Sequence, residues 1–386
     1  MGVLEGVTVV EVAALGPAPL CGSMLADLGA EVIVVERPAD DVGHPRPAEI
    51  WHRGKRSIVL DLKKPGATEV VLRLLDGADA LIEGMRPGVA ERLGFGPEVC
   101  LARRPSLVYG RMTGWGQHGP LSQAAGHDGN YIGVSGALSM AVPPRRRPEP
   151  PPGLFGDVAG GALYFAIGLL AGVLRARRDG LGQVVDAAMA DGSAHLINLL
   201  LSIASAGDGF AAARPGSDAR HFSRSYRCAD DRWINLCAVE PKFHAELLKR
   251  LGLDKDESFA NGFDDPASWA PLSRRLERLF AGKTSREWSA LLEGTDACFA
   301  PVLTLLEAAG HPHNAARGVY ATLDGIVQAA AAPRFLSTPS PPMARVPARG
   351  QHTRRVLAGL GLTNGEIERL ANAGTLGTAL TPAPVC

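Results

Sequence analysis

The sequence has no surplus of either charge, because 40 lysines and arginines balance 40 aspartates and glutamates. A neutral total does not favour nucleic acid or an anionic membrane as a partner. The sequence also lacks the ligand spacings of a metal site, since its six cysteines include no C-x-x-C and its ten histidines no H-E-x-x-H. His311 and His313 come closest to such a pair, and we expect them in a loop beside a helix. We therefore expect no metal ion.

Long hydrophobic runs are missing too. The longest apolar stretch, 160–174, is shorter than the roughly 20 residues of a membrane-spanning helix, and a basic cluster follows it at 175–178. The first residues contain no basic region followed by an apolar stretch, so we expect no secretory signal. Dispersed cysteines in a chain of 386 residues are typical of a reducing compartment. We expect a cytoplasmic protein.

What the sequence does have is 46% hydrophobic residues, arranged in alternating strand and helix patterns. Apolar runs predict strands at 7–12, 31–35, 57–61, 78–82 and 106–112. Helical spacing predicts helices between them at 17–29 and 66–75. Continuous apolar strands separated by helices are typical of a parallel sheet covered on both faces. We therefore predict an α/β fold with a Rossmann-like parallel sheet in a large domain.

The pattern changes after this domain. We predict a large domain at 1–190 completed by 325–386, a connecting segment at 191–225, a smaller α+β domain at 226–318, and a segment at 319–386 that returns to the large domain. Within these parts we expect helices at 156–178, 191–206 and 363–373. In the small domain we expect a strand at 232–239 and helices at 241–251, 266–281 and 284–293.

A glycine motif after the last of these strands has the G-x-G-x-x-G form of a dinucleotide site, with glycines at 114, 116 and 119. Such a site needs a helix that opens at the motif and an acidic residue about 20 positions later. Pro120 follows at once, and residue 139 is a serine. The first strand-to-helix turn, at 14–19, has one glycine and two prolines and also lacks the fingerprint. The sequence disfavours a dinucleotide cofactor.

Four cations lie at or near the ends of successive predicted strands, namely Arg37, Lys63, Arg86 and Arg92. Ligands of open α/β sheets bind at the carboxyl ends of the strands. An isolated arginine there is most often solvated, but four in successive loops indicate an anion site. The guanidinium fork of arginine suits phosphate because it presents two parallel donors.

Three further residues have two interpretations each. His127, in a loop segment, is either a structural hydrogen bonder or an acid/base group. Asp157 comes at an expected helix start, where a carboxylate caps the helix and is also favoured as an ionised base. Glu240 ends a strand before Pro241, as a solvated carboxylate or an orienting partner. The residues alone leave all three open.

Together these features resemble the class III CoA-transferase and α-methylacyl-CoA racemase family over nearly the whole chain. The segments that carry the resemblance are 6–11, 26–32, 36–38, 54–57, 60–63, 86–94, 113–117, 125–128, 182–186 and 294–298. The run Gly126-His127-Asp128 is similar to the racemase branch, since the transferases lack this histidine. Each segment is short, and their order makes the match specific.

The resemblance implies roles for particular residues. His127 and Asp157 would be the paired acid and base, and Glu240 would orient the histidine. The positions that match CoA-holding residues of the family are Arg37, Leu60, Asp61, Leu62, Lys63, Gly84, Met85, Arg86, Arg92, Gly126, Asp128, Asn130 and Tyr131. Coenzyme A would be part of the substrate, with no tightly bound cofactor. The family also implies an interlocked homodimer, with each site between the large domain of one chain and the small domain of its partner.

This pattern predicts a racemase or epimerase acting on the α-carbon of a 2-methylacyl-CoA in lipid metabolism. Two bases on opposite faces of an enolate would exchange the proton, and backbone N–H groups at the start of the Asp157 helix would bind the oxyanion. The alternatives are a CoA-transferase of the same fold, with Asp157 as nucleophile, and a non-catalytic acyl-CoA-binding protein. Two segments depart from the racemase pattern, the proline-rich 141–153 and 217–226. They leave the acyl group open.

Overall fold

The structure is a computed structural model of the chain, and it describes all residues except 1, 13, 141–146, 150–152, 206–219 and 377–386. The two departing segments, 141–153 and 217–226, thus fall partly outside the described residues. The chain forms two compact units. Unit 1 consists of Met1–Leu138, Pro150–Ile197 and Arg317–Cys386, and unit 2 of Ser139–Glu149 and Asn198–Ala316. Each unit has a hydrophobic core of its own.

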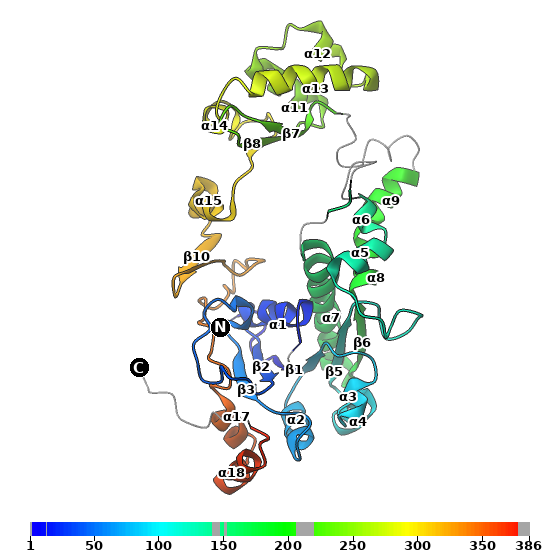
Figure 1. Cartoon of the computed structure of the whole chain (residues 1–386), viewed down its shortest axis with the longest axis vertical. Helices are drawn as coiled ribbons and strands as arrows, with labels where there is room; N and C mark the ends of the chain where they lie inside the picture. Colours follow the sequence, from blue (N-terminus) through cyan, green and yellow to red (C-terminus); the bar gives the residue numbers. More distant parts are fainter. Residues whose placement is uncertain (1, 13, 141–146, 150–152, 206–219, 377–386) are drawn as a thin grey trace. The chain divides into compact units, whose positions relative to one another are not determined.

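Unit 1 is built around a parallel sheet (Figure 1). Its strands are β1 (Thr8–Val12), β2 (Glu31–Glu36), β3 (Arg56–Val59), β4 (Ala80–Glu83), β5 (Val108–Thr113) and β6 (Gln183–Ala188). Their order is β3-β2-β1-β4-β5-β6. The predicted α/β fold class is confirmed. Strand β6 was not among the predicted strands.

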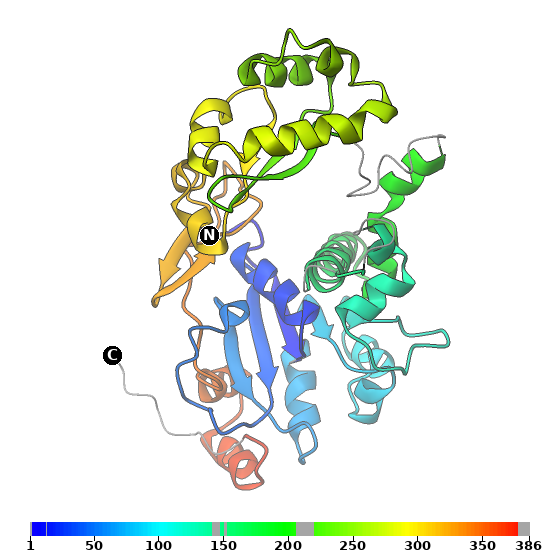
Figure 2. The same cartoon turned by 45° about the horizontal axis from the view of Figure 1, so that its top comes forward.

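The two faces of this sheet have separate cores, because successive side chains of a strand point to opposite sides. Val10 and the other core side chains on its face of the sheet pack against α2 (Ala67–Leu75), α17 (Thr353–Gly359) and α18 (Asn364–Asn372). Val9 faces the other way, towards α1 (Pro17–Asp27) and α7 (Tyr164–Asp179). The C-terminal helices α17 and α18, orange and red in Figure 2, therefore complete one face of a sheet that begins at the N-terminus.

Unit 1 also contains shorter elements. They are η1 (Ile50–His52), α3 (Val89–Arg92), α4 (Pro97–Arg103), α5 (Asp128–Val134), α6 (Ala137–Met140), whose last two residues belong to unit 2, the π-helix η2 (Leu154–Leu163), α8 (Met189–Leu196), and the hairpin β10 (Tyr320–Leu323) with β11 (Ile326–Ala329). The predicted helix at 191–206 is wrong as a single helix. It is interrupted at Ile197 and divides into α8 and α9 (Asn198–Ser205).

The helix predicted at 156–178 is longer than expected. η2 runs directly into α7, so that the continuous helix covers Leu154–Asp179. By length and composition alone this helix could cross a membrane, although 39% of its most apolar window is buried in the protein. Phe165 and Leu169 on its inner side belong to the core beneath β5. A core helix of a soluble protein passes the same test.

Unit 2 has an antiparallel sheet of β7 (Ser223–Arg227), β8 (Trp233–Cys237) and β9 (Phe299–Pro301), in that order. In the described residues its complete helices are α9, α11 (Pro241–Leu251), α12 (Glu257–Asn261), α13 (Pro266–Phe280), α14 (Ser285–Leu292), α15 (Leu305–Gly310) and α16 (Pro312–Ala316). Tyr226, Ile234, Leu276 and Trp288 are central in its core. The helices predicted at 241–251, 266–281 and 284–293 are confirmed to within one residue at each end.

Candidate active site

The carboxyl ends of β1 and β4 form the switch point of the sheet, because the chain continues towards β2 from one and towards β5 from the other. Ligands of open α/β sheets bind in the crevice outside such a point. The loops after these two strands approach closely, since a Cβ atom added at Gly84 would lie 2.7 Å from Cβ of Ala14. A glycine at 84 is therefore required for the two loops to meet.

Asp157 lies beside the turn that follows β1. It belongs to η2, which starts after Gly153 in the left-handed region (φ 68°). A Cβ atom on Gly16 would be 3.9 Å from each carboxylate oxygen of Asp157. The pKa of Asp157 is raised, first by burial and then by the negative charge of Asp128, while His127 lowers it. A half-buried carboxyl group with a raised pKa suits a residue that both accepts and returns a proton.

His127 occupies the residue position just before α5, and its backbone is held on both sides. Its N–H donates to Oδ1 of Asn130 at 3.0 Å. The preceding carbonyl, of Gly126, accepts a hydrogen bond from the Tyr131 hydroxyl. The His127 side chain itself is exposed, yet near enough to Asp157 to lower its pKa. The structure brings the backbones of these two predicted residues close within unit 1, because Oδ1 of the next residue, Asp128, accepts from the Asp157 N–H at 2.9 Å.

The glycine motif after β5 makes room for Tyr131. The Tyr131 ring meets Trp115 edge-on, with 4.8 Å between ring centroids. Cβ atoms added at Gly114 and Gly126 would lie 2.1 and 2.8 Å from Tyr131 ring atoms. The chain between β5 and α5 forms turns, and no helix begins at the glycine motif. A dinucleotide site would need a helix there. Tyr131, predicted to hold CoA, is largely buried in this packing.

Asp128 is buried and turned towards the Asp157 helix. Its Oδ1 accepts hydrogen bonds from the N–H groups of Gly156, at 2.7 Å, and of Asp157, at 2.9 Å. The next N–H, of Val158, donates to the carbonyl of Gly153. The oxyanion role expected for backbone N–H groups at the start of this helix is therefore not available to these three. The Asp128 side chain is engaged with η2, although its position matched a CoA-holding residue.

The four predicted phosphate-binding cations are exposed. Arg37 follows β2, Lys63 follows β3, Arg86 follows β4, and Arg92 ends α3. Within the described residues none of these four side chains has a carboxylate partner. An exposed cation without an internal partner is free to bind an external anion. Their positions at the carboxyl edge of the sheet are those expected of a phosphate site.

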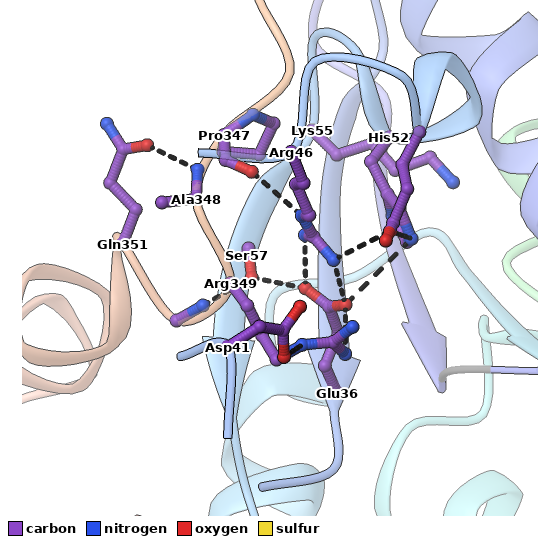
Figure 3. Close-up of polar contacts among 12 residues, drawn as sticks. Glu36, Asp41, Arg46, His52, Lys55, Ser57, Pro347, Ala348, Arg349 and Gln351 are labelled. Atoms are coloured by element: carbon purple, nitrogen blue, oxygen red, sulfur yellow. Dashed lines mark hydrogen bonds and ion pairs between the residues drawn. The ribbon is translucent and has the colours of Figure 1, made fainter. Parts of the chain in front are cut away.

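Glu36 lies directly before Arg37 and is fixed by a buried network (Figure 3). Arg46 donates to both of its carboxylate oxygens, each at 2.6 Å, and Arg349 donates to Oε1 at 2.9 Å. The Ser57 hydroxyl donates as well. Burial raises the pKa of Glu36, but the hydrogen bonds from Arg46 and Ser57 outweigh it and the net pKa is lowered. The network fixes the end of β2 from which Arg37 projects.

Glu83 is fixed by a similar set of hydrogen bonds at the end of β4. It accepts hydrogen bonds from Nε of Arg111 at 2.9 Å and from the Met85 N–H at 2.7 Å. Arg111 also pairs with Glu91, at 2.8 Å. Burial raises the pKa of Glu83. These contacts fix the backbone of the Gly84–Met85 segment, and with it the base of Arg86.

The buried carboxylates at the strand ends escaped the sequence analysis. A third, Glu11 in β1, pairs with Lys55 at 2.7 Å, and neither side chain is exposed. The signal was present, because each of these strands is an apolar run with a glutamate inside it or at its carboxyl end. A charge so placed is buried and must be paired. The sequence could not say which cations supply the pairs, since Lys55, Arg46 and Arg111 are distant along the chain.

The other residues predicted for the site include two leucines in the core, an aspartate bonded to a nearby backbone N–H group, and Glu240 in unit 2. Leu60 is fully buried and Leu62 packs on the same core, so their side chains are not free for a ligand. Oδ1 of Asp61 accepts from the Lys63 N–H at 3.1 Å. Glu240 belongs to unit 2, where it precedes α11 and lies 3.3 Å from Nζ of Lys242. Its predicted role beside His127 stays a prediction.

A recess elsewhere in unit 1 contains none of these residues. Its volume is about 460 Å³, and Asp27, Arg53 and parts of 317–343 line it. Arg53 is already engaged, since its Nε donates to Asp27 at 2.9 Å. Across the described parts of the chain, no group of three or more histidine, cysteine, aspartate or glutamate side chains could hold a metal ion.

Comparison with known proteins gives three findings. The family model for CoA-transferase family III matches residues 4–353. The α-methylacyl-CoA racemase of Homo sapiens is 39% identical over 375 residues, 95% of this chain and 96% of that protein. The acetyl-CoA:oxalate CoA-transferase of Acetobacter aceti is 29% identical, over 84% of this chain and 87% of that protein.

Solved structures agree with these relatives. A CAIB/BAIF family protein from Brucella suis superposes with a TM-score of 0.81 at 26% sequence identity. The match covers 93% of this chain and 99% of that one. The similarity therefore extends over both units, and neither is an addition to a shorter relative.

Proposed function

The chain belongs to CoA-transferase family III, and from this we propose that it is an α-methylacyl-CoA racemase. It would invert the carbon next to the thioester of a 2-methylacyl-CoA. The observation that carries the proposal is that Asp128, the residue after His127, accepts a hydrogen bond from the N–H of Asp157, whose carboxylate lies beside the turn after β1. The racemase of Homo sapiens is also more similar to this chain than the oxalate transferase is.

The proposed chemistry is a proton transfer through an enolate. One of the two groups removes the α-proton from one face, and the other delivers a proton to the opposite face. Histidine can serve as either acid or base because its pKa is ordinarily near neutrality. The raised pKa of Asp157 brings the carboxyl group closer to the same range. A well-placed base contributes about 10²–10⁴-fold to such a rate, so each group should matter separately.

Coenzyme A would bind along the carboxyl edge of the sheet. The unpaired cations Arg37, Lys63, Arg86 and Arg92 would bind its phosphates, and the backbone of 60–63 and 84–85 would line the remaining path. Glu36 and Glu83 hold the backbone beneath Arg37 and Arg86, so that two of these arginines start from fixed positions. Coenzyme A then anchors the acyl group while the protein supplies the acid and base.

A CoA-transferase is the second candidate, because the family includes such enzymes. In that reaction Asp157 would attack the thioester carbonyl, release the CoA thiolate and form an acyl anhydride. His127 speaks against it, since a transferase of this kind has no need of a second acid/base group beside the nucleophile. Glu240 would orient His127 in the racemase, by the family resemblance.

The test is incubation of the purified protein with the separate epimers of a 2-methylacyl-CoA in D2O. Deuterium should enter the α-carbon, each epimer should give rise to the other, and CoA should not pass to an added free acid. Transfer of CoA to that acid at a comparable rate would overturn the proposal and make Asp157 a nucleophile.

Single variants sharpen the test. His127→Ala and Asp157→Asn should each lower racemisation by about 100-fold or more while CoA still binds. Each should retain α-proton exchange for one epimer only, because one base survives on one face. Asp179→Asn is the matched control, since Asp179 is exposed and pairs with Arg178 at the far end of α7. It should keep the wild-type rate.

A further inference from the structure

The side chain of Asp128 is the direct link between the two elements that carry the proposed acid and base. Asp128 is the first residue of α5, immediately after His127, and its carboxylate accepts hydrogen bonds from Gly156 and Asp157 at the start of η2. One oxygen atom, Oδ1, takes both bonds, at 2.7 and 2.9 Å. These contacts join residues 28 and 29 positions apart in the chain.

The surroundings are shaped for this contact. A Cβ atom at Gly156 would lie 2.5 Å from Oδ1 of Asp128 and 3.2 Å from the Ile132 side chain, so residue 156 has to be a glycine for the carboxylate to reach the helix. Asp128 is buried, and burying a carboxylate is costly unless hydrogen bonds compensate it. The carboxylate also lies at the N-terminal ends of α5 and η2, where helix dipoles favour a negative charge.

From this geometry we infer that Asp128 is a positioning residue of the active site, which sets the place of Asp157 relative to His127 rather than contacting coenzyme A. The inference rests on the proposed racemase function for its kinetic meaning. Its structural part, that Asp128 anchors the first turn of η2, does not depend on any activity.

The negative charge of Asp128 has a second consequence for the same site. The groups that act electrostatically with Asp157 are Asp128 and His127, which shift its pKa, and Tyr131 on the next turn of α5, whose own pKa Asp157 raises. Burial is the larger cause of the raised pKa of Asp157, and the negative charge of Asp128 raises it further. Asp128 thus contributes both to the position of the proposed acid/base group, through two hydrogen bonds, and, after burial, to its raised pKa.

Two substitutions separate position from charge. In Asp128→Asn the amide oxygen can still accept both N–H bonds, but the negative charge is lost. In Asp128→Ala both bonds are lost. Gly156→Ala disrupts the same contact from η2, because the added Cβ atom would displace Oδ1 of Asp128. We expect Asp128→Ala and Gly156→Ala to lower kcat by about 10- to 100-fold with little change in KM, since small misplacements of reacting groups are costly and the phosphate contacts are remote.

Asp128→Asn should keep most of kcat and shift the pH profile. Without the negative neighbour the pKa of Asp157 falls. In the direction in which Asp157 acts as base, the acidic limb of kcat should move to lower pH. In the opposite direction, in which Asp157 acts as acid, the alkaline limb should move to lower pH as well. A residue with only a structural role would lower the amount of active enzyme and leave both limbs in place.

An activity-independent measurement completes the test. Amide hydrogen exchange of the peptide that covers 154–163 should be slow in the wild type and in Asp128→Asn, and faster in Asp128→Ala and Gly156→Ala. Unchanged protection in both alanine variants would overturn the inference. A raised KM with unchanged kcat in Asp128→Ala would also overturn it, and would restore Asp128 to a CoA contact. If the exchange pattern is as expected but the wild type does not exchange the α-proton, the proposed function fails and the anchoring role stands.

Discussion

At the scale of single residues, the arginines of unit 1 divide into engaged and free groups. Arg46 and Arg111 are buried and bound to glutamates, whereas Arg37, Arg86 and Arg92 are exposed with no described carboxylate partner. Arginine buried against a carboxylate serves the fold, and removing either partner of such a pair costs about 3–5 kcal/mol. The free group is the one available to a phosphate.

We therefore expect Ala variants of Arg37, Arg86 and Arg92 each to weaken CoA binding by about tenfold to a hundredfold, because a charge-assisted phosphate contact contributes roughly 1.5–3 kcal/mol. Calorimetric titration with CoA would measure it. Arg56→Ala is the control. Arg56 is half-buried, starts β3 at the opposite end of the strands and pairs with Glu31. Unchanged affinity in all three test variants would mean that the phosphates bind elsewhere.

The sequence predicted the residues of the candidate site better than their contacts. His127 was named from the run Gly126-His127-Asp128 and Asp157 from its place at an expected helix start, and the family resemblance implied their roles. The use of the Asp128 carboxylate could not be foreseen, since its partners lie far along the chain and only the fold brings them together. The same holds for Arg349, which reaches Glu36 from the C-terminal part of the chain. A motif indicates which residue is special, but a long-range hydrogen bond appears only in three dimensions.

At the scale of elements, the position of the Asp157 helix depends on a close contact between glycines. A Cβ atom at Gly160 of η2 would lie 2.4 Å from Oγ of Ser193 in α8, and one at Gly192 would lie 1.9 Å from the carbonyl oxygen of Gly160. The backbones of η2 and α8 touch, and no larger residue fits between them. The helix that carries Asp157 can lie here only because glycines at 160 and 192 leave room for the two backbones.

We expect Gly160→Ala to lower the free energy of unfolding by about 1–3 kcal/mol, because the added methyl group has to displace α8. Racemisation should fall with it, since the same shift moves Asp157. Gly359→Ala is the control, because Gly359 is helical and a Cβ atom there meets nothing within 4 Å. That change should be neutral or stabilising by up to about 1 kcal/mol. Urea unfolding of both variants checks the pair, and equal stabilities would refute the packing argument.

The burial of each element explains whether it could be predicted from the sequence. The strands β1 and β2 are continuous apolar runs, and the predicted ranges differ from the structure by one residue at one end. Strand β6 was missed because its residues alternate between half-buried and exposed, so the sequence has no continuous apolar run. The hairpin of β10 and β11 was missed although its turn, Asp324-Gly325, has positive φ at both residues. An Asp-Gly pair is a known hairpin signal and could have identified it.

At the scale of the whole chain, unit 2 is inserted into unit 1. The chain leaves unit 1 after Ile197 and re-enters it at Arg317, and the returning segment is fastened to the early strands. Nε of Arg46 donates to the carbonyl of Pro347 (Figure 3). The Gly350 N–H donates to Oγ of Ser57. Since α17 and α18 cover one face of the sheet, the core of unit 1 is incomplete until the last part of the chain has been made.

Unit 1 has an apolar surface that its own described residues do not cover. Helix α7 buries Phe165 and Leu169 against the sheet, but on its other side Ile167 is 62% and Leu174 72% exposed. These two are seven positions apart and share one face of the helix, together with Leu163, which ends η2. A helix apolar on both sides is normally covered on both. An exposed patch of this kind marks an interface.

We propose that a second copy of the chain covers this stripe, in the homodimer that the family resemblance implies. Light scattering at low micromolar concentration should give about twice the chain mass of 40.5 kDa. Ile167→Lys with Leu174→Lys should give the single-chain mass with an unchanged circular dichroism spectrum, because both side chains are exposed in the isolated chain and a buried charge at the interface costs several kcal/mol. A fully active wild-type monomer would exclude the dimer. If the wild type is a monomer that sediments with neutral lipid vesicles, and the double variant does not sediment with them, the stripe binds a membrane surface instead.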